Sequence, residues 1–130
     1  MYSYYRDHDE PMFTEVFVFG SNEAGRHGRG AALHAKQFHG ARIGVGEGYT
    51  GTAYALPTKD KNIQTLPLEV IKSKIETFKQ YALANQNNAG FFVTKIGCGL
   101  AGYSSSQIAP LFKGSPTNCR FHIDWKQYLE

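Results

Sequence analysis

The sequence predicts an α/β domain in which helices pack against a largely parallel β-sheet. Apolar runs rich in β-branched and aromatic residues alternate along the chain with segments of helical pattern. Glycines gather in three clusters, and two of these clusters directly follow apolar runs. The loops beyond the carboxyl ends of parallel strands hold ligands, so this placement predicts a binding cleft. A length of 130 residues fits one domain over residues 1–130, and we expect residues 1–12 to be loosely ordered.

The first half of the chain predicts three strands and a helix. Residues 13–19 are apolar and stop at Gly20, as a buried strand does before a loop. Residues 30–39 favour a helix, and Gly40 ends it. Three segments are expected to follow: a short strand over 41–45, a turn over 46–51, and a strand over 52–56 that Pro57 closes.

The second half of the chain predicts two helices and two strands. Apolar residues recur there at helical spacing, and they are Leu68, Ile71, Ile75, Phe78 and Ala82. Three elements are expected after this helix: a strand over 91–96, a short helix from a serine cap at 104–106 to Phe112, and a strand over 119–124. Residues 125–130 form a tail or a helical turn.

Composition and charge exclude several classes of protein. The longest apolar runs are four or five residues, too short to span a membrane, and the first residues lack the apolar stretch of a signal peptide. The net charge of +3 weakly favours anionic ligands. The sequence has no dense run of Lys and Arg of the kind that marks an obvious nucleic-acid binder. Cys98 and Cys119 lie far apart, which favours free thiols in a reducing compartment. We therefore expect a cytoplasmic protein.

The loop over residues 97–103 has the composition of an anion-binding turn. Three glycines within it let successive backbone N–H groups point inward, and the start of the next helix adds its positive dipole. The loop matches neither the dinucleotide-binding fingerprint nor the P-loop pattern. A plain tight turn is the alternative interpretation.

The loop over residues 20–30 also leads from a strand into a helix. The Asn22 amide can donate to and accept from a sugar diol, and its alternative role is to close an Asx turn. Arg26 and Arg29 either pair with phosphate or are simply solvated, and we favour the solvated state for both. Lys59 follows a strand on the cleft side, where a partly desolvated amine becomes a nucleophile. An exposed loop lysine is the common alternative.

The histidine spacing predicts no metal site. His27, His34 and His39 do not form a known zinc motif, and His34 and His39 are five residues apart, so they do not share a helical face well. Cys98 lies beside glycines that could lower its pKa. No histidine is placed to serve as its base, so we interpret Cys98 as a small buried residue.

Together these segments resemble the macrodomain family, a three-layer α/β/α fold with a mixed, largely parallel sheet that binds ADP-ribose. Residues 20–32 resemble the loop around the distal ribose, and 46–59 resemble the middle strands of the family. Residues 92–100 resemble the strand and loop that cradle the diphosphate. The resemblance covers about residues 13–112.

Within macrodomains the chain is most similar to two groups of ADP-ribosyl glycohydrolases. One is the terminal ADP-ribose protein glycohydrolase, and the other is the DNA ADP-ribosyl glycohydrolase antitoxin. Both carry a Thr-Lys pair after the middle strand and a Gly-Cys-Gly loop, as Thr58-Lys59 and Gly97-Cys98-Gly99 stand here. The resemblance implies that Lys59 is catalytic and that Asn22 is the polar residue of the substrate loop.

The chain also departs from both groups. The protein glycohydrolase has an aspartate where this chain has Ala101, and the DNA-directed group has a glycine there. Residues 56–60 resemble the DNA-directed pattern more, but Lys61-Asn62-Ile63 stands where that group has further polar residues. Adenine-binding candidates are given by location only, and they are Asp7, Asp9, Glu10 and the pair Asp124 and Trp125.

We therefore expect an ADP-ribosyl glycohydrolase that removes ADP-ribose from a nucleobase or a carboxylate with a lysine, and needs no metal or cofactor. Its partner would be ADP-ribose or ADP-ribosylated DNA or protein. The alternatives are a non-catalytic ADP-ribose or nucleotide-signal module, and a structural protein with an interface strip at Tyr2, Tyr4 and Tyr5. The expected catalytic residues are Lys59 and Asn22; the expected ligand-binding residues are Gly20, Ser21, Asn22, Gly28, Arg29, Gly30, Ala31, Thr58, Gly97, Cys98, Gly99, Leu100, Ala101, Gly102 and Tyr103.

Overall fold

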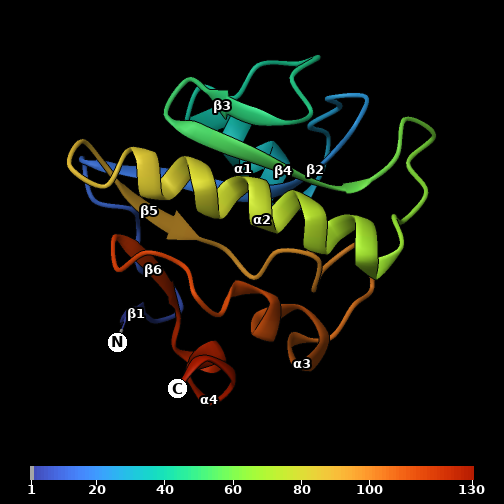
Figure 1. Ribbon diagram of the computed structural model, residues 1–130. Coiled ribbons are helices and arrows are strands. Elements are labelled where there is room, and N and C mark those ends of the chain that lie inside the picture. Colours follow the sequence, from blue (N-terminus) through green and yellow to red (C-terminus); the bar gives the residue numbers. More distant parts are fainter. Residues whose placement is uncertain (1) are drawn as a thin grey trace.

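The computed structural model describes residues 2–130, which form a six-stranded sheet with helices on both faces (Figure 1). The strands run in the order β1-β6-β5-β2-β4-β3, and every neighbouring pair is parallel except β3 with β4. The strands are β1 (Ser3–Tyr5), β2 (Glu15–Asn22), β3 (Gly48–Thr50), β4 (Ala53–Lys59), β5 (Gly90–Val93) and β6 (Cys119–His122). The expected α/β class with a mixed, largely parallel sheet is confirmed.

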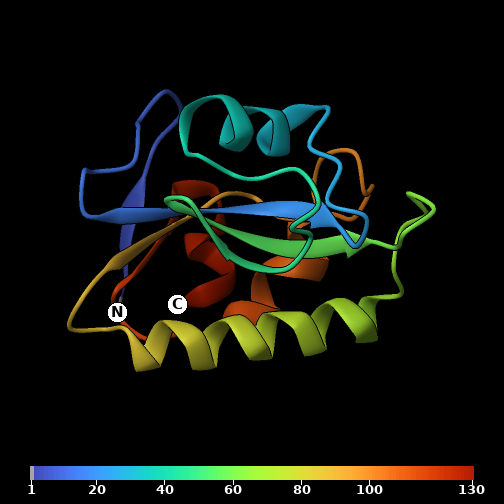
Figure 2. The same ribbon diagram turned by 90° about the horizontal axis from the view of Figure 1, so that it is seen from above.

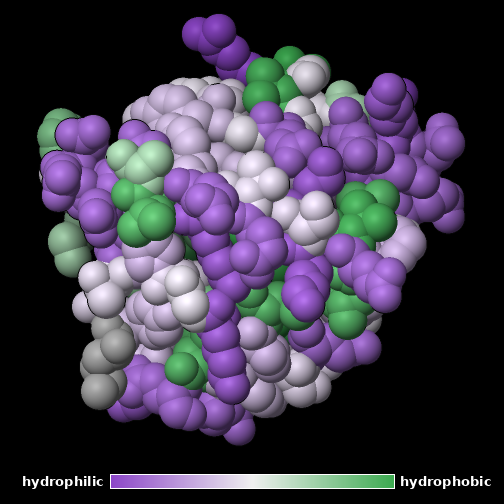
Figure 3. Space-filling view, viewed as in Figure 1, coloured by the Kyte–Doolittle hydropathy of each residue, from purple (hydrophilic) through white to green (hydrophobic). Residues whose placement is uncertain are grey.

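The helices divide into two layers that cover opposite faces of the sheet (Figure 2). One layer is α1 (Gly30–Phe38). The other holds α2 (Leu68–Ala84), α3 (Ser105–Ile108), the 3-10 turns η1 (Ala109–Phe112) and η2 (Ile123–Trp125), and α4 (Lys126–Leu129). On the face that α2 crosses, hydrophobic residues form separate small areas among hydrophilic ones (Figure 3).

Strand β2 explains the three layers, because its alternating residues serve two cores. Val16 and Val18 point to the larger core under α2, while Phe17 and Phe19 point to the smaller core under α1. A strand buried on both faces belongs in the middle of a sheet, where β2 lies between β5 and β4. The buried stripe of α2 consists of Ile71, Ile75, Phe78 and Ala82, as the spacing predicts.

The amino-terminal segment contains a strand that the sequence does not predict. Residues 3–5 form β1, which pairs in parallel with β6 instead of being loose. Tyr5 is buried and stacks on Phe92 with 3.9 Å between ring centroids, and the Tyr2 hydroxyl donates to the carbonyl of Ser115. These tyrosines therefore pack against the fold, which removes the feature on which the structural-protein alternative depended.

The expectation of a strand over 41–45 and a turn over 46–51 is wrong, because the strand lies within the segment expected to turn. Residues 41–45 are a loop whose Gly44 N–H donates to the carbonyl of Gly25. The strand is β3, which pairs with β4 from Gly48 opposite Ala55. Strand β4 continues through Pro57, because beyond Ala55 it has no partner on its β3 side and needs no N–H donor there.

Three other boundaries differ by a few residues. Strand β5 ends at Val93, because both the N–H and the hydroxyl of Thr94 donate to the carbonyl of Val18 and turn the chain. Strand β6 stops at His122, before η2 begins. The short helix expected up to Phe112 is α3 followed by the 3-10 turn η1 at Pro110.

Candidate functional site

A cavity of about 490 Å³ lies at the carboxyl ends of the three central strands. Strands β5, β2 and β4 are parallel neighbours, so their carboxyl ends meet at one edge of the sheet. The chain leaves β2 through α1 toward β4 and returns through α2 on the other face to β5, so this edge is a topological switch point. The lining residues are Gly20, Ser21, Asn22, Arg26, Gly28, Arg29, Gly30, Ala31, Ala32, Thr58, Lys59, Ile63, Thr94, Lys95, Ile96, Gly97, Gly99, Leu100 and Ala101.

Every charged residue in this lining is basic. Arg26, Arg29 and Lys59 make no ion pair within residues 2–130, and Lys95 pairs with Asp124 at 3.2 Å. Four cations around one cavity focus a positive potential into it. Both arginines are exposed and both contribute to the cavity wall; Arg29 is among the expected ligand-binding residues, and Arg26 is not.

The amino terminus of α1 opens into the cavity. Its N-cap residue, Arg29, provides no side-chain hydrogen bond, and the first turn has no acidic residue. The first backbone hydrogen bond of the helix comes from Leu33, whose N–H donates to the carbonyl of Arg29 at 3.1 Å. The N–H groups of Gly30, Ala31 and Ala32 therefore lie at the positive end of the helix dipole, on the cavity wall.

The glycine loop after β5 forms another wall. Gly97 has φ of +78°, a conformation that favours glycine, and a Cβ atom there would lie 3.1 Å from Ile108 Cδ1, which would have to shift. The N–H of Tyr103 donates to the carbonyl of Gly97 at 2.9 Å and closes the loop. Between these ends, Gly99, Leu100 and Ala101 face the cavity, and no backbone hydrogen bond from their N–H groups is formed within residues 2–130.

Two hydrogen bonds fasten this glycine loop to the segment that follows β4. The Thr65 hydroxyl donates to the carbonyl of Ala101 at 3.1 Å, and the Tyr103 hydroxyl donates to that of Leu66 at 2.7 Å. The same segment contributes Ile63 to the lining, with φ of +62°. A β-branched residue rarely adopts this left-handed conformation, so strain is held at the cavity edge.

Asn22 organises the loop that follows β2. Its side-chain amide donates to the carbonyl of Arg26 at 2.8 Å, and its Oδ1 accepts from the Arg26 N–H at 3.0 Å. This is the Asx-type closure that was the alternative interpretation of Asn22. The residue still lines the cavity, and the neighbouring Ser21 hydroxyl donates to the carbonyl of Gly46.

Lys59 ends β4, and its backbone pairs with Asn22 on one side and with Thr65 on the other. Its carbonyl accepts from the N–H of Glu23 at 2.9 Å. The carboxylates of Glu47 and Asp60 are both engaged with other groups. Glu47 pairs with Lys74 at 2.9 Å, and Asp60 Oδ1 accepts from the N–H groups of Asn62 and Gln64.

Three of the expected site residues lie outside the cavity lining, and they are Cys98, Gly102 and Tyr103. Burial raises the pKa of the Cys98 thiol, against opposing effects of the Ser105 hydroxyl and Lys95. Cys98 is half-buried and is a thiol at neutral pH, not an activated nucleophile.

The expected adenine-binding residues are placed elsewhere as well. Trp125 is fully buried, and its Nε1 donates to the Ser105 hydroxyl at 3.0 Å, so it cannot stack on a ligand in the cavity. Asp7 contacts His122 at 2.7 Å, and Asp9 accepts from the N–H of Arg6. None of these residues lines the cavity.

Sequence analysis missed the segment Thr94, Lys95 and Ile96, which lines the cavity between β5 and the glycine loop. The signal was present, because these residues directly precede Gly97 at the end of a predicted strand. Ala32 and Ile63 were missed for another reason. Their place in the lining depends on how α1 and the loop after β4 pack, which no local pattern encodes.

Known structures share this fold. The Thermosipho africanus protein DarTG, solved in complex with ADP-ribose, superposes with a TM-score of 0.60 and 17% identity. The match covers 85% of this chain and 38% of that one, so the chain spans well under half the length of DarTG. The chain has a macrodomain-like fold.

A protein of unknown function from Bacteroides thetaiotaomicron superposes over more of its own length. Its TM-score is 0.58 at 15% identity, with 86% of this chain and 90% of that chain covered. No family model and no curated protein matches the sequence. Among residues 2–130 no helix combines the length and hydrophobicity that crossing a membrane requires.

Proposed function

We propose that the cavity binds ADP-ribose. The observation that carries the proposal is the distribution of charge and donors: all charged lining residues are basic, and residues of α1 and of the glycine loop whose N–H groups have no backbone partner within residues 2–130 line the cavity. A diphosphate is the group that such a surface favours. The macrodomain-like fold supports the same ligand, because DarTG was solved with ADP-ribose.

Each part of ADP-ribose would lie against a different wall of the cavity. The diphosphate lies on the N–H groups of Gly99 to Ala101, with Lys95 and Arg29 nearby in the lining. The distal ribose lies between Asn22 and the backbone of Gly28 to Gly30. The volume of about 490 Å³ is within the range of small-molecule sites.

We further propose that Lys59 makes the protein an ADP-ribosyl glycohydrolase acting on ADP-ribosylated DNA or protein. Its amine has no ion-pair partner within residues 2–130 and lines the cavity beside Asn22. Such an amine serves as nucleophile at the anomeric carbon or as base toward water.

A binding module without catalysis is the second candidate. The observation that favours it is the lining itself, which contains no carboxylate to serve as general acid, and in which Ala101 follows Leu100 in the glycine loop. Release of ADP-ribose by the wild-type protein and not by a Lys59→Ala variant rejects this candidate.

Calorimetric titration with ADP-ribose, with AMP as comparison ligand, tests the binding proposal. We expect micromolar affinity for ADP-ribose and at least about tenfold weaker binding of AMP, because AMP lacks the second phosphate and the distal ribose. Arg29→Ala should weaken ADP-ribose, whereas Arg42→Ala, an exposed arginine outside the lining, should leave it unchanged. Equal affinity for both ligands, or no binding, would reject ADP-ribose as the ligand.

A further inference from the structure

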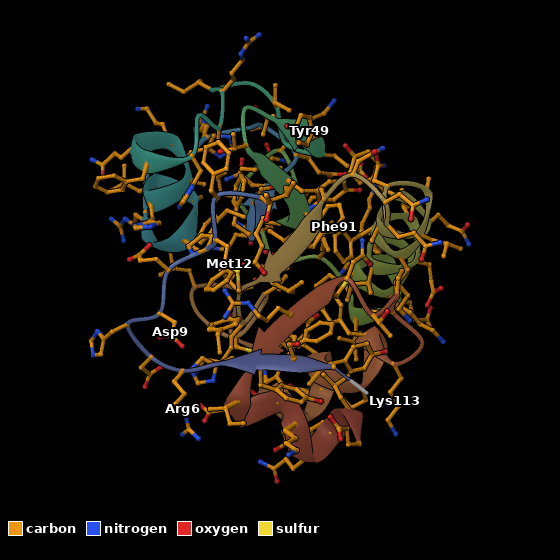
Figure 4. All side chains as sticks on the ribbon, turned by 90° about the vertical axis from the view of Figure 1, so that its left-hand side faces the viewer. Arg6, Asp9, Met12, Tyr49, Phe91 and Lys113 are labelled. Atoms are coloured by element: carbon orange, nitrogen blue, oxygen red, sulfur yellow. The ribbon has the colours of Figure 1, made fainter. Side chains whose placement is uncertain are left out.

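A cluster of one carboxylate and two imidazoles lies beside the carboxyl-terminal half of α1, outside the cavity lining. Glu10, His34 and His39 each offer one ligand atom, and these atoms lie within 4.8 Å of one another. Glu10 belongs to the segment between β1 and β2, which runs past one end of α1 near Asp9 and Met12 (Figure 4). None of the three residues lines the cavity.

The histidine pair corrects the expectation drawn from their spacing. Residues five apart diverge on a regular helix, but α1 ends at Phe38. His39 is the C-cap residue, with φ of −128° and ψ of 15°, so its side chain leaves the helical progression. The two rings lie 5.2 Å apart between centroids.

The packing around His39 leaves an imidazole nitrogen unused. The ring stacks on Phe17 with 4.4 Å between centroids and 15° between planes, and its Nε2 is buried without a hydrogen-bond partner among the residues described. An imidazole nitrogen without a hydrogen-bond partner is available to a metal ion.

The third ligand, Glu10, has a hydrogen-bonded backbone carbonyl and an exposed side chain. Arg120 donates to both carboxylate oxygens of Glu15, at 2.9 and 2.7 Å, and also reaches the carbonyl of Glu10 at 3.5 Å. The Glu10 carboxylate itself is 72% exposed and lies 4.0 Å from His34 Nε2. This separation exceeds a hydrogen bond, so the pair does not satisfy itself directly.

We propose that Glu10, His34 and His39 bind a divalent transition metal ion such as Zn²⁺. Two imidazoles and one carboxylate are a ligand set that zinc accepts, and the exposure of Glu10 leaves a fourth position for water. Ligand atoms around tetrahedral zinc lie roughly 3.4 Å apart, given zinc–ligand bonds of about 2.0–2.1 Å. Ligand atoms up to 4.8 Å apart must therefore approach one another by as much as about 1.4 Å, and rotation of the exposed Glu10 and half-buried His34 side chains brings them toward His39, which the stack on Phe17 holds in place. The bound ion joins the segment before β2 to α1.

Titration of the full chain with ZnCl₂ tests this site, after removal of any affinity tag and treatment with a chelator. We expect one ion per chain and a higher Tm with zinc, because the ion binds the folded form. His34→Ala, His39→Ala and Glu10→Gln should each weaken zinc by at least about tenfold and abolish the Tm increase. His8→Asn is the matched control, since His8 is exposed on the same segment, lies outside the cluster and has φ of +73°, which asparagine tolerates.

Glu10→Gln decides the outcome if His39→Ala fails to fold after losing the stack on Phe17, because the Glu10 side chain is exposed and supports no core. Zinc binding that all three variants retain indicates an adventitious ion only and overturns the site, as does the absence of binding. Co²⁺ titration gives a second readout, since visible bands of tetrahedral cobalt are expected in the wild type and not in Glu10→Gln. ADP-ribose affinity should be the same in Glu10→Gln and wild type, which separates this test from that of the cavity.

Discussion

Asn22 and Lys59 are register partners at the carboxyl ends of β2 and β4, directly after a shift in register between Ser21 and Asn22. The pairing brings the amide that closes the loop after β2 next to an amine without an ion-pair partner in residues 2–130. Both residues line the cavity, so a sugar held by Asn22 lies within reach of Lys59. The proposed chemistry depends on this juxtaposition.

Lys59→Ala should remove glycohydrolase activity and leave ADP-ribose affinity within about tenfold, or about 1.4 kcal/mol. The reason is that the diphosphate donors come from backbone N–H groups that the substitution does not touch. The measurement is release of ADP-ribose from modified DNA and modified protein, alongside calorimetry. Lys61→Ala, at an exposed lysine outside the lining, is the control. Equal losses of turnover and binding would argue against a catalytic role.

Asn22→Ala should lower the free energy of unfolding by about 1–3 kcal/mol and weaken ADP-ribose. The substitution leaves the N–H and the carbonyl of Arg26 without partners in a loop that lines the cavity. Urea unfolding measures the first effect, and calorimetry measures the second. Asn87→Ala, at an exposed asparagine with no side-chain hydrogen bond within residues 2–130, should change neither. An Asn22→Ala protein of wild-type stability would mean that the loop closes without this amide.

Gly97→Ala should destabilise the protein more than Gly114→Ala does. Both glycines have positive φ, +78° and +83°, but only at Gly97 would the added Cβ crowd a neighbour, Ile108. The strained conformation costs each variant about 1 kcal/mol, and crowding adds to the cost at Gly97. ADP-ribose affinity should fall for Gly97→Ala alone, because Gly114 lies outside the lining. Thermal unfolding with calorimetry compares the two variants, and equal effects would remove the argument from crowding.

Glu15→Gln should lower the free energy of unfolding by about 2 kcal/mol at pH 7, a value that allows for partial screening by solvent. The reason is that the mostly buried guanidinium of Arg120 loses its carboxylate partner. Desolvation raises the pKa of Glu15, but hydrogen bonds from Arg120 and the Met12 N–H outweigh it, so the pKa is lowered. A lowered folded-state pKa gives stability that is fully present above the ordinary glutamate pKa of 4.5. That stability is lost as pH falls through the folded-state pKa.

Urea unfolding of wild type and Glu15→Gln between pH 7 and pH 3 checks this prediction. The difference in unfolding free energy should shrink below about pH 4.5, because the wild-type carboxylate becomes protonated. Glu76→Gln is the control, since the Glu76 carboxylate is exposed and its partner Lys79 keeps a second acceptor, the carbonyl of Lys113, so Glu76 should contribute within about 0.5 kcal/mol. A difference that stays constant with pH would contradict the lowered pKa.

The sequence predicts the central part of the fold because local periodicity encodes burial there. In β2, valine and phenylalanine alternate, which predicts that both faces of the strand are buried. In α2, the apolar stripe from Ile71 to Ala82 predicts which face of the helix packs on the sheet. The glycine loops after β2 and before α3 also follow from strand ends, and most residues expected at the site do line the cavity.

The parts that escaped prediction depend on contacts between distant segments. The three residues of β1 carry little pattern of their own and become a strand only by pairing with β6 near the other end of the chain. Trp125 looks like a ligand-stacking residue in sequence, but the larger core buries it completely. His34 and His39 approach each other only because α1 ends between them.

Chemical-shift mapping of the backbone amides during an ADP-ribose titration tests the central claim most directly. The account predicts the largest shifts at Gly30 to Ala32 and at Gly99 to Ala101, whose N–H groups face the cavity without backbone partners in the described chain. Amides of α4, on the far side of the larger core, should not move. Saturable shifts centred outside these two segments, or no shifts at millimolar ADP-ribose, would contradict the account.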